Sequence, residues 1–227
     1  MRHLIVLSGS LTAGPLLDRL LTPRDHVVAA DGGSDHLRLL GIAPNLVVGD
    51  FDSIKPAGRQ WIERQEIAVH RYPTAKNATD SEIALDASLS ALPPDSRPED
   101  VELVILGALG SRPDHVLGNQ MMAASLAERG YRVVMSDGIS LIYALAGPGR
   151  QQIDLHQFPE TDWAVSSIAV SREATGLTYA GLQYPLDHFT LPFGSSRGLS
   201  NKPAKPDSVI EVSLTAGTIL FCLTPDH

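Results

Sequence analysis

The chain has 227 residues, of which 43% are hydrophobic and 19% charged, the composition of a folded protein with one large domain or two smaller ones. Its formal net charge of −8 argues against general nucleic-acid binding, which needs a basic surface, so we expect no nucleic-acid partner. Apolar runs stay below the roughly 18 residues that cross a bilayer, so we expect no membrane partner either.

The first 136 residues alternate between short apolar runs and helical patterns, which predicts β-α units and a mostly parallel sheet covered on both faces. We expect strands at Leu4–Leu7, His26–Ala30, Leu46–Val48, Ala68–Tyr72, Val101–Leu106 and Arg132–Met135. We expect helices at Pro15–Leu21, Ser34–Leu40, Pro56–Gln65, Thr79–Leu89 and Asp114–Arg129. The opening segment has too short an apolar stretch for a secretory leader.

From Asp137 onward the apolar residues come in short alternating runs separated by Gly, Pro and Ser, which predicts antiparallel β structure. The expected strands are Ile139–Leu145, Gln152–Leu155, Val165–Val170, Leu177–Ala180, Val209–Leu214 and Ile219–Leu223. We therefore predict an α/β fold with a mostly parallel α/β sandwich lobe at residues 1–137 and an antiparallel β-sandwich lobe at residues 138–227. The single cysteine, Cys222, allows no intrachain disulfide, and we expect a cytoplasmic protein.

Acidic residues directly follow two predicted strands, where ligands of open α/β sheets bind. Asp31 is followed by Gly32 and Gly33, which let the backbone approach a ligand closely. Asp50 and Asp52 lie two residues apart, so on an extended chain both carboxylates point to one side and suit a shared cation. The alternative is that these are ordinary turn and helix-cap residues.

Two further segments carry polar groups suited to phosphate. Thr79 and Glu82 form the S/T-x-x-E capping box, which predicts a helix start with Asp80 in its first turn, where it can merely complement the helix dipole. Lys76 can supply a cation for a phosphate. The second segment runs from Leu106 to His115, with Asn119 one turn further on. Its glycines, which follow a strand, leave backbone N–H groups free, and Arg112 offers a planar donor fork.

Within that second segment, His115 is either a phosphate donor or a cap or packing residue. The chain contains neither G-x-x-x-x-G-K-[ST] nor G-x-G-x-x-G after a strand, which argues against a P-loop enzyme and a standard dinucleotide binder.

Together these motifs resemble, in order and spacing, the catalytic lobe of thiamin pyrophosphokinases. The matching pieces are Ala30-Asp31-Gly32-Gly33, Gly49-Asp50-Phe51-Asp52-Ser53, Lys76 through Asp80, and Arg112-Pro113-Asp114-His115. The resemblance continues into the second lobe, where Gly181 through Leu186 and Gly198-Leu199-Ser200-Asn201 look like the family's motifs.

The resemblance implies transfer of the pyrophosphoryl group of ATP to the hydroxyl of thiamin, giving thiamin diphosphate and AMP, with Mg²⁺ as the cofactor. It also implies a homodimer whose active sites lie between one subunit's catalytic lobe and the other's β lobe. By position, the catalytic and metal-binding acids are Asp31, Asp50, Asp52 and Asp80. The implied ATP-binding residues are Gly32, Gly33, Lys76, Thr79, Arg112, Asp114, His115 and Asn119, and the implied thiamin-binding residues are Ser200 and Asn201.

Three positions depart from the family pattern: Asn77 replaces a usual aspartate, Ser111 a usual glycine, and Lys202 a frequent acid. Three rival functions stay open. One is a pyrophosphokinase acting on another hydroxymethyl heterocycle of the pterin type. Another is a D-x-D metal-dependent phosphohydrolase, although Ile54 stands where that motif wants threonine. The third is a non-catalytic sensor of thiamin or nucleotide.

Overall fold

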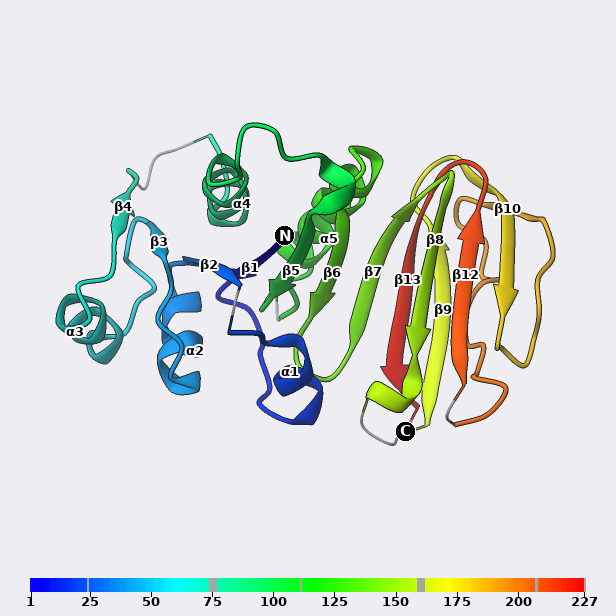
Figure 1. Ribbon diagram of the computed structural model, residues 1–227, viewed down its shortest axis with the longest axis horizontal. Helices are drawn as coiled ribbons and strands as arrows, with labels where there is room; N and C mark the ends of the chain where they lie inside the picture. Colours follow the sequence, from blue (N-terminus) through cyan, green and yellow to red (C-terminus); the bar gives the residue numbers. More distant parts are fainter. Residues whose placement is uncertain (24, 74–76, 111, 159–161, 207, 227) are drawn as a thin grey trace.

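The computed structural model describes residues 1–23, 25–73, 77–110, 112–158, 162–206 and 208–226. Its described strands form two sheets (Figure 1). The larger has nine strands in the order β4-β3-β2-β1-β5-β6-β7-β13-β9, and the smaller has four in the order β11-β10-β12-β8. Within these residues, no helix is long and apolar enough to span a membrane.

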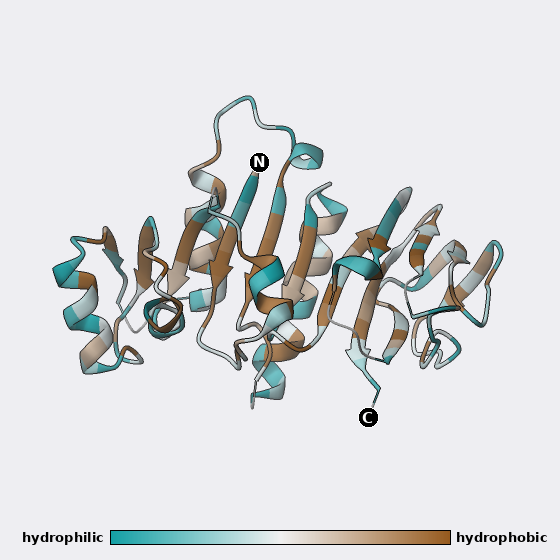
Figure 2. Ribbon diagram, turned by 60° about the horizontal axis from the view of Figure 1, so that its bottom comes forward, coloured by the Kyte–Doolittle hydropathy of each residue, from teal (hydrophilic) through white to brown (hydrophobic). Residues whose placement is uncertain are grey.

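The first six strands pair in parallel, as the alternating pattern predicts. They are β1 (Arg2–Val6), β2 (His26–Ala30), β3 (Leu46–Gly49), β4 (Val69–Arg71), β5 (Glu102–Leu106) and β6 (Arg132–Ser136). Five of these six strands are nearly continuous runs of buried residues, because helices cover both faces of the sheet; β4 at the edge is exposed. Figure 2 shows the resulting band of hydrophobic strands at the centre of the molecule.

Helices α1 (Pro15–Leu20), α2 (Gly33–Leu40) and α3 (Pro56–Arg64) pack on one face of the large sheet, and α4 (Asp80–Ser90) and α5 (Pro113–Glu128) on the other. Three of the five begin with proline, whose fixed φ and missing N–H suit the first turn. Helix α4 begins with the predicted capping box: the Thr79 hydroxyl accepts the Glu82 amide at 3.2 Å, and the Glu82 carboxylate accepts the Thr79 amide at 2.8 Å.

The second half of the chain extends the same large sheet. Strands β7 (Leu141–Ala146), β13 (Thr218–Pro225) and β9 (Trp163–Ala169) add to β6 in antiparallel pairing. The smaller sheet consists of β8 (Gly149–Asp154), β10 (Glu173–Ala180), β11 (Phe189–Pro192) and β12 (Val209–Leu214). Buried side chains such as Phe221 and Val212 fill the space between the two sheets and complete a β-sandwich.

The predicted fold class is confirmed, and most predicted element ends lie within two residues of the observed ones. The sequence pattern missed β11 and two short 3₁₀ helices, Pro98–Asp100 and Leu155–Gln157. It also gave no sign that one sheet runs through both lobes. The predicted boundary at Asp137 falls in the tight turn between β6 and β7, where its carboxylate accepts the amides of Ile139 and Ser140 at 3.0 and 2.7 Å.

Candidate active site

Three carboxylates meet at the carboxyl ends of β2 and β3. One oxygen each from Asp31, Asp50 and Asp52 lies within 4.8 Å of the others. Asp31 is buried, Asp50 is half-buried and Asp52 is exposed, so the cluster opens toward solvent. Three like charges at this spacing repel one another, and a bound cation relieves that repulsion.

The close approach of the strands depends on Gly49. This residue has φ 140°, and a Cβ placed on it would stand 2.1 Å from Oδ1 of Asp31. A side chain at this position would therefore displace the buried carboxylate. Asp31 itself accepts the Phe51 amide at 2.9 Å, which ties the end of β2 to the loop after β3.

The two carboxylates of that loop are fixed locally. Oδ1 of Asp50 accepts the Asp52 amide at 3.1 Å, and Oδ1 of Asp52 accepts the Ser53 hydroxyl at 2.8 Å. The acids are thus part of a hydrogen-bonded turn as well as a candidate cation site. The interpretation as turn residues and the interpretation as cation ligands are therefore compatible.

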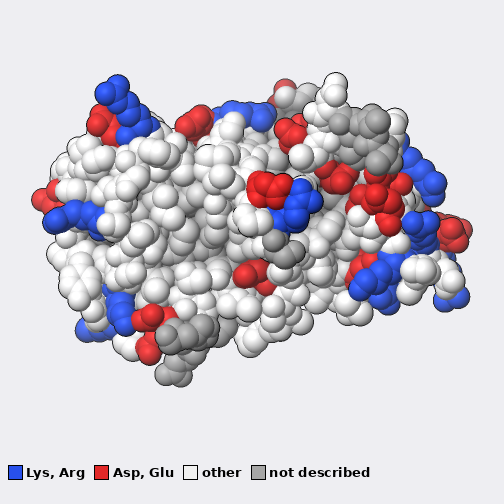
Figure 3. Space-filling model, turned by 180° about the vertical axis from the view of Figure 1, so that it is seen from behind, with Lys and Arg blue, Asp and Glu red and all other residues white. Residues whose placement is uncertain are grey.

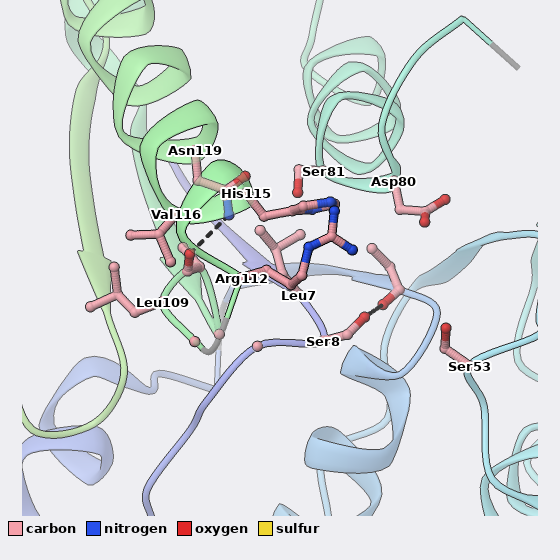
Figure 4. A pocket seen from close by; sticks show the side chains of 15 residues that line it. Leu7, Ser8, Ser53, Asp80, Ser81, Leu109, Arg112, His115, Val116 and Asn119 are labelled. Atoms are coloured by element: carbon pink, nitrogen blue, oxygen red, sulfur yellow. Dashed lines mark hydrogen bonds between the residues drawn. The ribbon is translucent and has the colours of Figure 1, made fainter.

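A cavity of about 350 Å³ (Figure 4) has Ala30 and Ser53 in its lining, each next in sequence to an acid of the cluster, but none of the three acids themselves. Its lining comes from the loops after β1 and β5 and from the first turns of α4 and α5. The lining includes Ser8, Gly9, Ser53, Asp80, Ser81, Gly107, Gly110, Arg112, His115 and Asn119. The helix N-termini suit an anionic ligand because of the positive ends of their dipoles, whereas the amides of Gly9 and Gly107 already donate to the Gly107 and Ser136 carbonyls.

Arg112 and Asp114 form an exposed bidentate pair at the start of α5, with N···O distances of 3.0 and 2.6 Å. The hydrogen bonds from Arg112 hold the pKa of the Asp114 carboxyl well below its usual range. The ion pair with Asp114 orients the Arg112 guanidinium, which lines the cavity. His115 lines both this cavity and a neighbouring one between α4 and α5.

Several predicted site residues have structural duties as well. Asp80, the first residue of α4, lines the cavity but lies outside the cluster of three carboxylates found among the described residues. Thr79 caps its helix. The buried Asn119 donates to the Ala108 carbonyl at 2.9 Å and so fixes the glycine-rich loop. At Gly33 a Cβ would stand 2.0 Å from the Val6 carbonyl oxygen, so this glycine lets α2 pack against β1.

The predicted thiamin-binding residues lie far from this cluster within one chain. Asn201 pairs with Val165 of β9, and six inter-strand spacings separate β9 from β2 in the sheet. At about 4.8 Å each, this is a separation of roughly 29 Å. The side chain of Asn201 is buried and holds the Tyr184 backbone, accepting its amide at 3.0 Å and donating to its carbonyl at 2.7 Å. Ser200 is exposed at φ 58°.

Sequence reasoning left Ser8, Ser53 and Ser81 out of the site, although all three line the cavity. Ser8 directly follows β1, so the rule that ligands bind beyond strand ends would have found it. Lys76 and Ser111, both singled out in the sequence, lie outside the described residues.

The parallel sheet, the acidic cluster at its carboxyl edge and the adjoining glycine-lined cavity are features shared with α/β proteins that bind phosphorylated ligands. Comparison with known proteins makes this specific. The family model "Thiamin pyrophosphokinase, catalytic domain" matches residues 17–135, and "Thiamin pyrophosphokinase, vitamin B1 binding domain" matches residues 151–219. The chain belongs to the thiamin pyrophosphokinase family, which consists of ATP-dependent pyrophosphoryl transferases.

Individual relatives agree with this assignment. A thiamine pyrophosphokinase of Bacillus subtilis is 31% identical over 175 residues, which are 77% of each chain. The crystal structure of the thiamine pyrophosphokinase from B. subtilis superposes with a TM-score of 0.84 at 27% identity and full coverage of both chains. Thiamin pyrophosphokinase from Candida albicans shares the fold, with a TM-score of 0.80 at 18% identity, covering 99% of this chain and 89% of its own.

Proposed function

We propose that this protein transfers the pyrophosphoryl group of ATP to the hydroxyl of thiamin, giving thiamin diphosphate and AMP. The observation that carries the proposal is the convergence of three carboxylates beside a cavity with phosphate-binding character, in a chain whose two lobes match both family models. The hydroxyl gives up its proton to solvent or a carboxylate, and its oxygen bonds to the β-phosphorus of ATP. The bond from that phosphorus to the α,β-bridging oxygen breaks, and AMP leaves with the electron pair.

The donor set fits Mg²⁺, which prefers hard oxygen ligands and usually takes only one or two carboxylates directly. Asp31, Asp50 and Asp52 would hold the ion, which would neutralise charge on the phosphate oxygens. We propose that Asp80, which lines the cavity at the start of α4, influences the orientation of the phosphates and the ion from there and is not a fourth direct ligand of the ion.

The basic groups of the cavity complement these acids. Arg112 and His115 line the cavity and would donate to phosphate oxygens as charge develops on the leaving AMP. Asp114 holds the Arg112 fork in place, and Asn119 maintains the glycine-rich loop that lines the cavity. Binding both reactants in this geometry supplies much of the rate enhancement, because phosphoryl transfer depends mainly on positioning and electrostatics.

A second copy of the chain is proposed to complete the active site. The roughly 29 Å that separates Ser200 and Asn201 from the acidic cluster supports this, because no small substrate spans that distance. The exposed side chains of Leu117, Met121 and Ile168 lie on the side of the large sheet that α5 covers and offer apolar contact area. Figure 3 shows that charged side chains gather over the first lobe and leave much of the second lobe's rear surface uncharged.

The activity is tested by incubating the full chain with ATP, Mg²⁺ and thiamin and separating the products by chromatography. Equimolar AMP and thiamin diphosphate, absent when thiamin or Mg²⁺ is omitted, would support the proposal. Asp52→Asn should abolish product formation, whereas Asp95→Asn, an exposed carboxylate in a distant turn, should not. Phosphate release without thiamin would favour the phosphohydrolase. Turnover of a pterin alcohol instead of thiamin would favour the related pyrophosphokinase. Saturable ligand binding without turnover would favour the sensor.

The shared site is tested by mixing two inactive variants, Asp52→Asn and Ser200→Trp. If each site combines one subunit's acids with the other's β lobe, random pairing restores about a quarter of the native rate. A mixture that stays inactive, together with a monomer in sedimentation, would refute the dimer. We also propose that the protein is cytoplasmic. We propose a division between the lobes near Asp137, and the gap between the two family matches, at residues 136–150, supports that division.

A further inference from the structure

The loop of residues 50–55, between β3 and α3, has an uncommon backbone conformation. Phe51 has φ 71°, in the left-handed region that a non-glycine residue occupies only when its surroundings hold it there. Asp50 and Asp52 flank this residue. The directions in which their carboxylates leave the chain therefore depend on how Phe51 is held.

Arg59, in the first turn and a half of α3, reaches back to this loop. Its guanidinium donates to the Phe51 carbonyl at 2.5 Å and to the Ile54 carbonyl at 3.3 Å. The amide of Phe51 donates to Asp31. The peptide groups on both sides of Phe51 are thus fixed, one by a carboxylate of the cluster and the other by Arg59.

Helix α3, which carries Arg59, is itself held in place. The buried Asp35 of α2 accepts the Lys55 amide at 2.9 Å, at the N-terminus of α3. Gly58 lies so close that a Cβ there would stand 2.6 Å from Oδ1 of Asp35. Helix α3 is therefore anchored to α2 through Asp35, which fixes both the last residue of the loop and the backbone position of Arg59.

We infer that Arg59 is a positioning residue for the cation site: it holds the 50–55 loop so that Asp50 and Asp52 converge on Asp31. The inference rests on the metal-binding role proposed above for these acids. Arg59 is not among the residues that line the cavity, and it acts through the loop backbone.

Charge and geometry predict opposite effects of removing Arg59. Loss of a positive charge near three carboxylates should, by Coulomb attraction alone, tighten the binding of a cation. Loss of a group that orients metal ligands typically weakens metal binding by about 10–100-fold. The direction of the change therefore separates the two explanations.

The test uses Mn²⁺ as the probe, with free Mn²⁺ measured by electron paramagnetic resonance on the full chain without nucleotide. Arg59→Met should bind Mn²⁺ about tenfold more weakly than the native protein. Arg59→Lys keeps the charge but lacks the planar fork that reaches two carbonyls, and its affinity should fall between them. Arg64→Met, which removes the same charge from the end of the same helix, should bind like the native protein.

A second readout follows the loop directly. Amide hydrogen exchange of the segment 50–55 should be faster in Arg59→Met than in Arg64→Met. Without metal, we expect the two variants to have closely similar melting temperatures. Native or tighter Mn²⁺ binding by Arg59→Met, with unchanged exchange, would overturn the inference. Unchanged Mn²⁺ binding by Asp52→Asn would refute the metal role of the acids instead, and the exchange measurement would still decide whether Arg59 holds the loop.

Discussion

Replacing Gly49 with alanine should damage both the acidic cluster and the fold. The added Cβ would stand 2.1 Å from Oδ1 and 2.5 Å from Cγ of Asp31, where ordinary contact begins near 3.4 Å. The carboxylate must therefore move by at least about 1 Å, a misplacement that can cost roughly 100-fold in rate. Its hydrogen bond from Phe51 is lost as well, and alanine is strained at φ 140°.

The broken hydrogen bond and the backbone strain together should lower the free energy of unfolding by about 3 kcal/mol. For a chain of this length, that corresponds to a fall in Tm of roughly 10 °C. Gly118→Ala is the matched control, since nothing lies within 4 Å of a Cβ there and the exposed helical position should gain about 0.5–1 kcal/mol. Native rate and Tm in Gly49→Ala would refute the argument that Asp31 is held by this close approach.

Three further perturbations test other parts of the structure. Burial lowers the pKa of His3, and the charge of His26 lowers it further. The unfolded chain therefore binds more protons than the folded one as pH falls through about 6.5. Tm should therefore be maintained above that pH and fall below it, and His3→Gln should reduce this dependence in melts from pH 8 to 5. Thr79→Ala removes the cap of α4 and should lower the unfolding free energy by about 1 kcal/mol in denaturant titrations. Asn201→Ala should cost about 2–3 kcal/mol without any ligand, because the Tyr184 backbone loses its partners; an unchanged Tm would mean that Asn201 serves only to contact substrate.

Much of the first lobe was predictable because its rules are local. The alternation of apolar runs and helical patterns gave the order of β1 to β6 and of the five helices, and the T-x-x-E pattern located the start of α4. The strand-end rule placed Asp31 and Asp50 where ligands of such sheets bind, and the family resemblance assigned both to one metal site; the structure brings them together because β2 and β3 are neighbours in the sheet.

Other features depend on contacts between residues far apart in sequence, which periodicity does not record. The role of Gly33 is set by the Val6 carbonyl, and that of Asn201 by the Tyr184 backbone. Strand β11 has only four residues and ends in proline, so its short pattern was indistinguishable from the surrounding loop. The pairing of β6 with β7 was hidden because the turn residues at Asp137 look alike whether they join two strands or separate two domains.

That pairing bears on how the protein can be divided. A fragment ending at residue 137 would strip β6 of its partner β7 and leave a row of backbone N–H and C=O groups along a hydrophobic strand, a template for aggregation. The catalytic half is thus not a freestanding unit, although its own family model describes it. For the same reason the two halves cannot swing apart as hinged bodies, and any closing movement during turnover must come from loops or from the second copy of the chain proposed above.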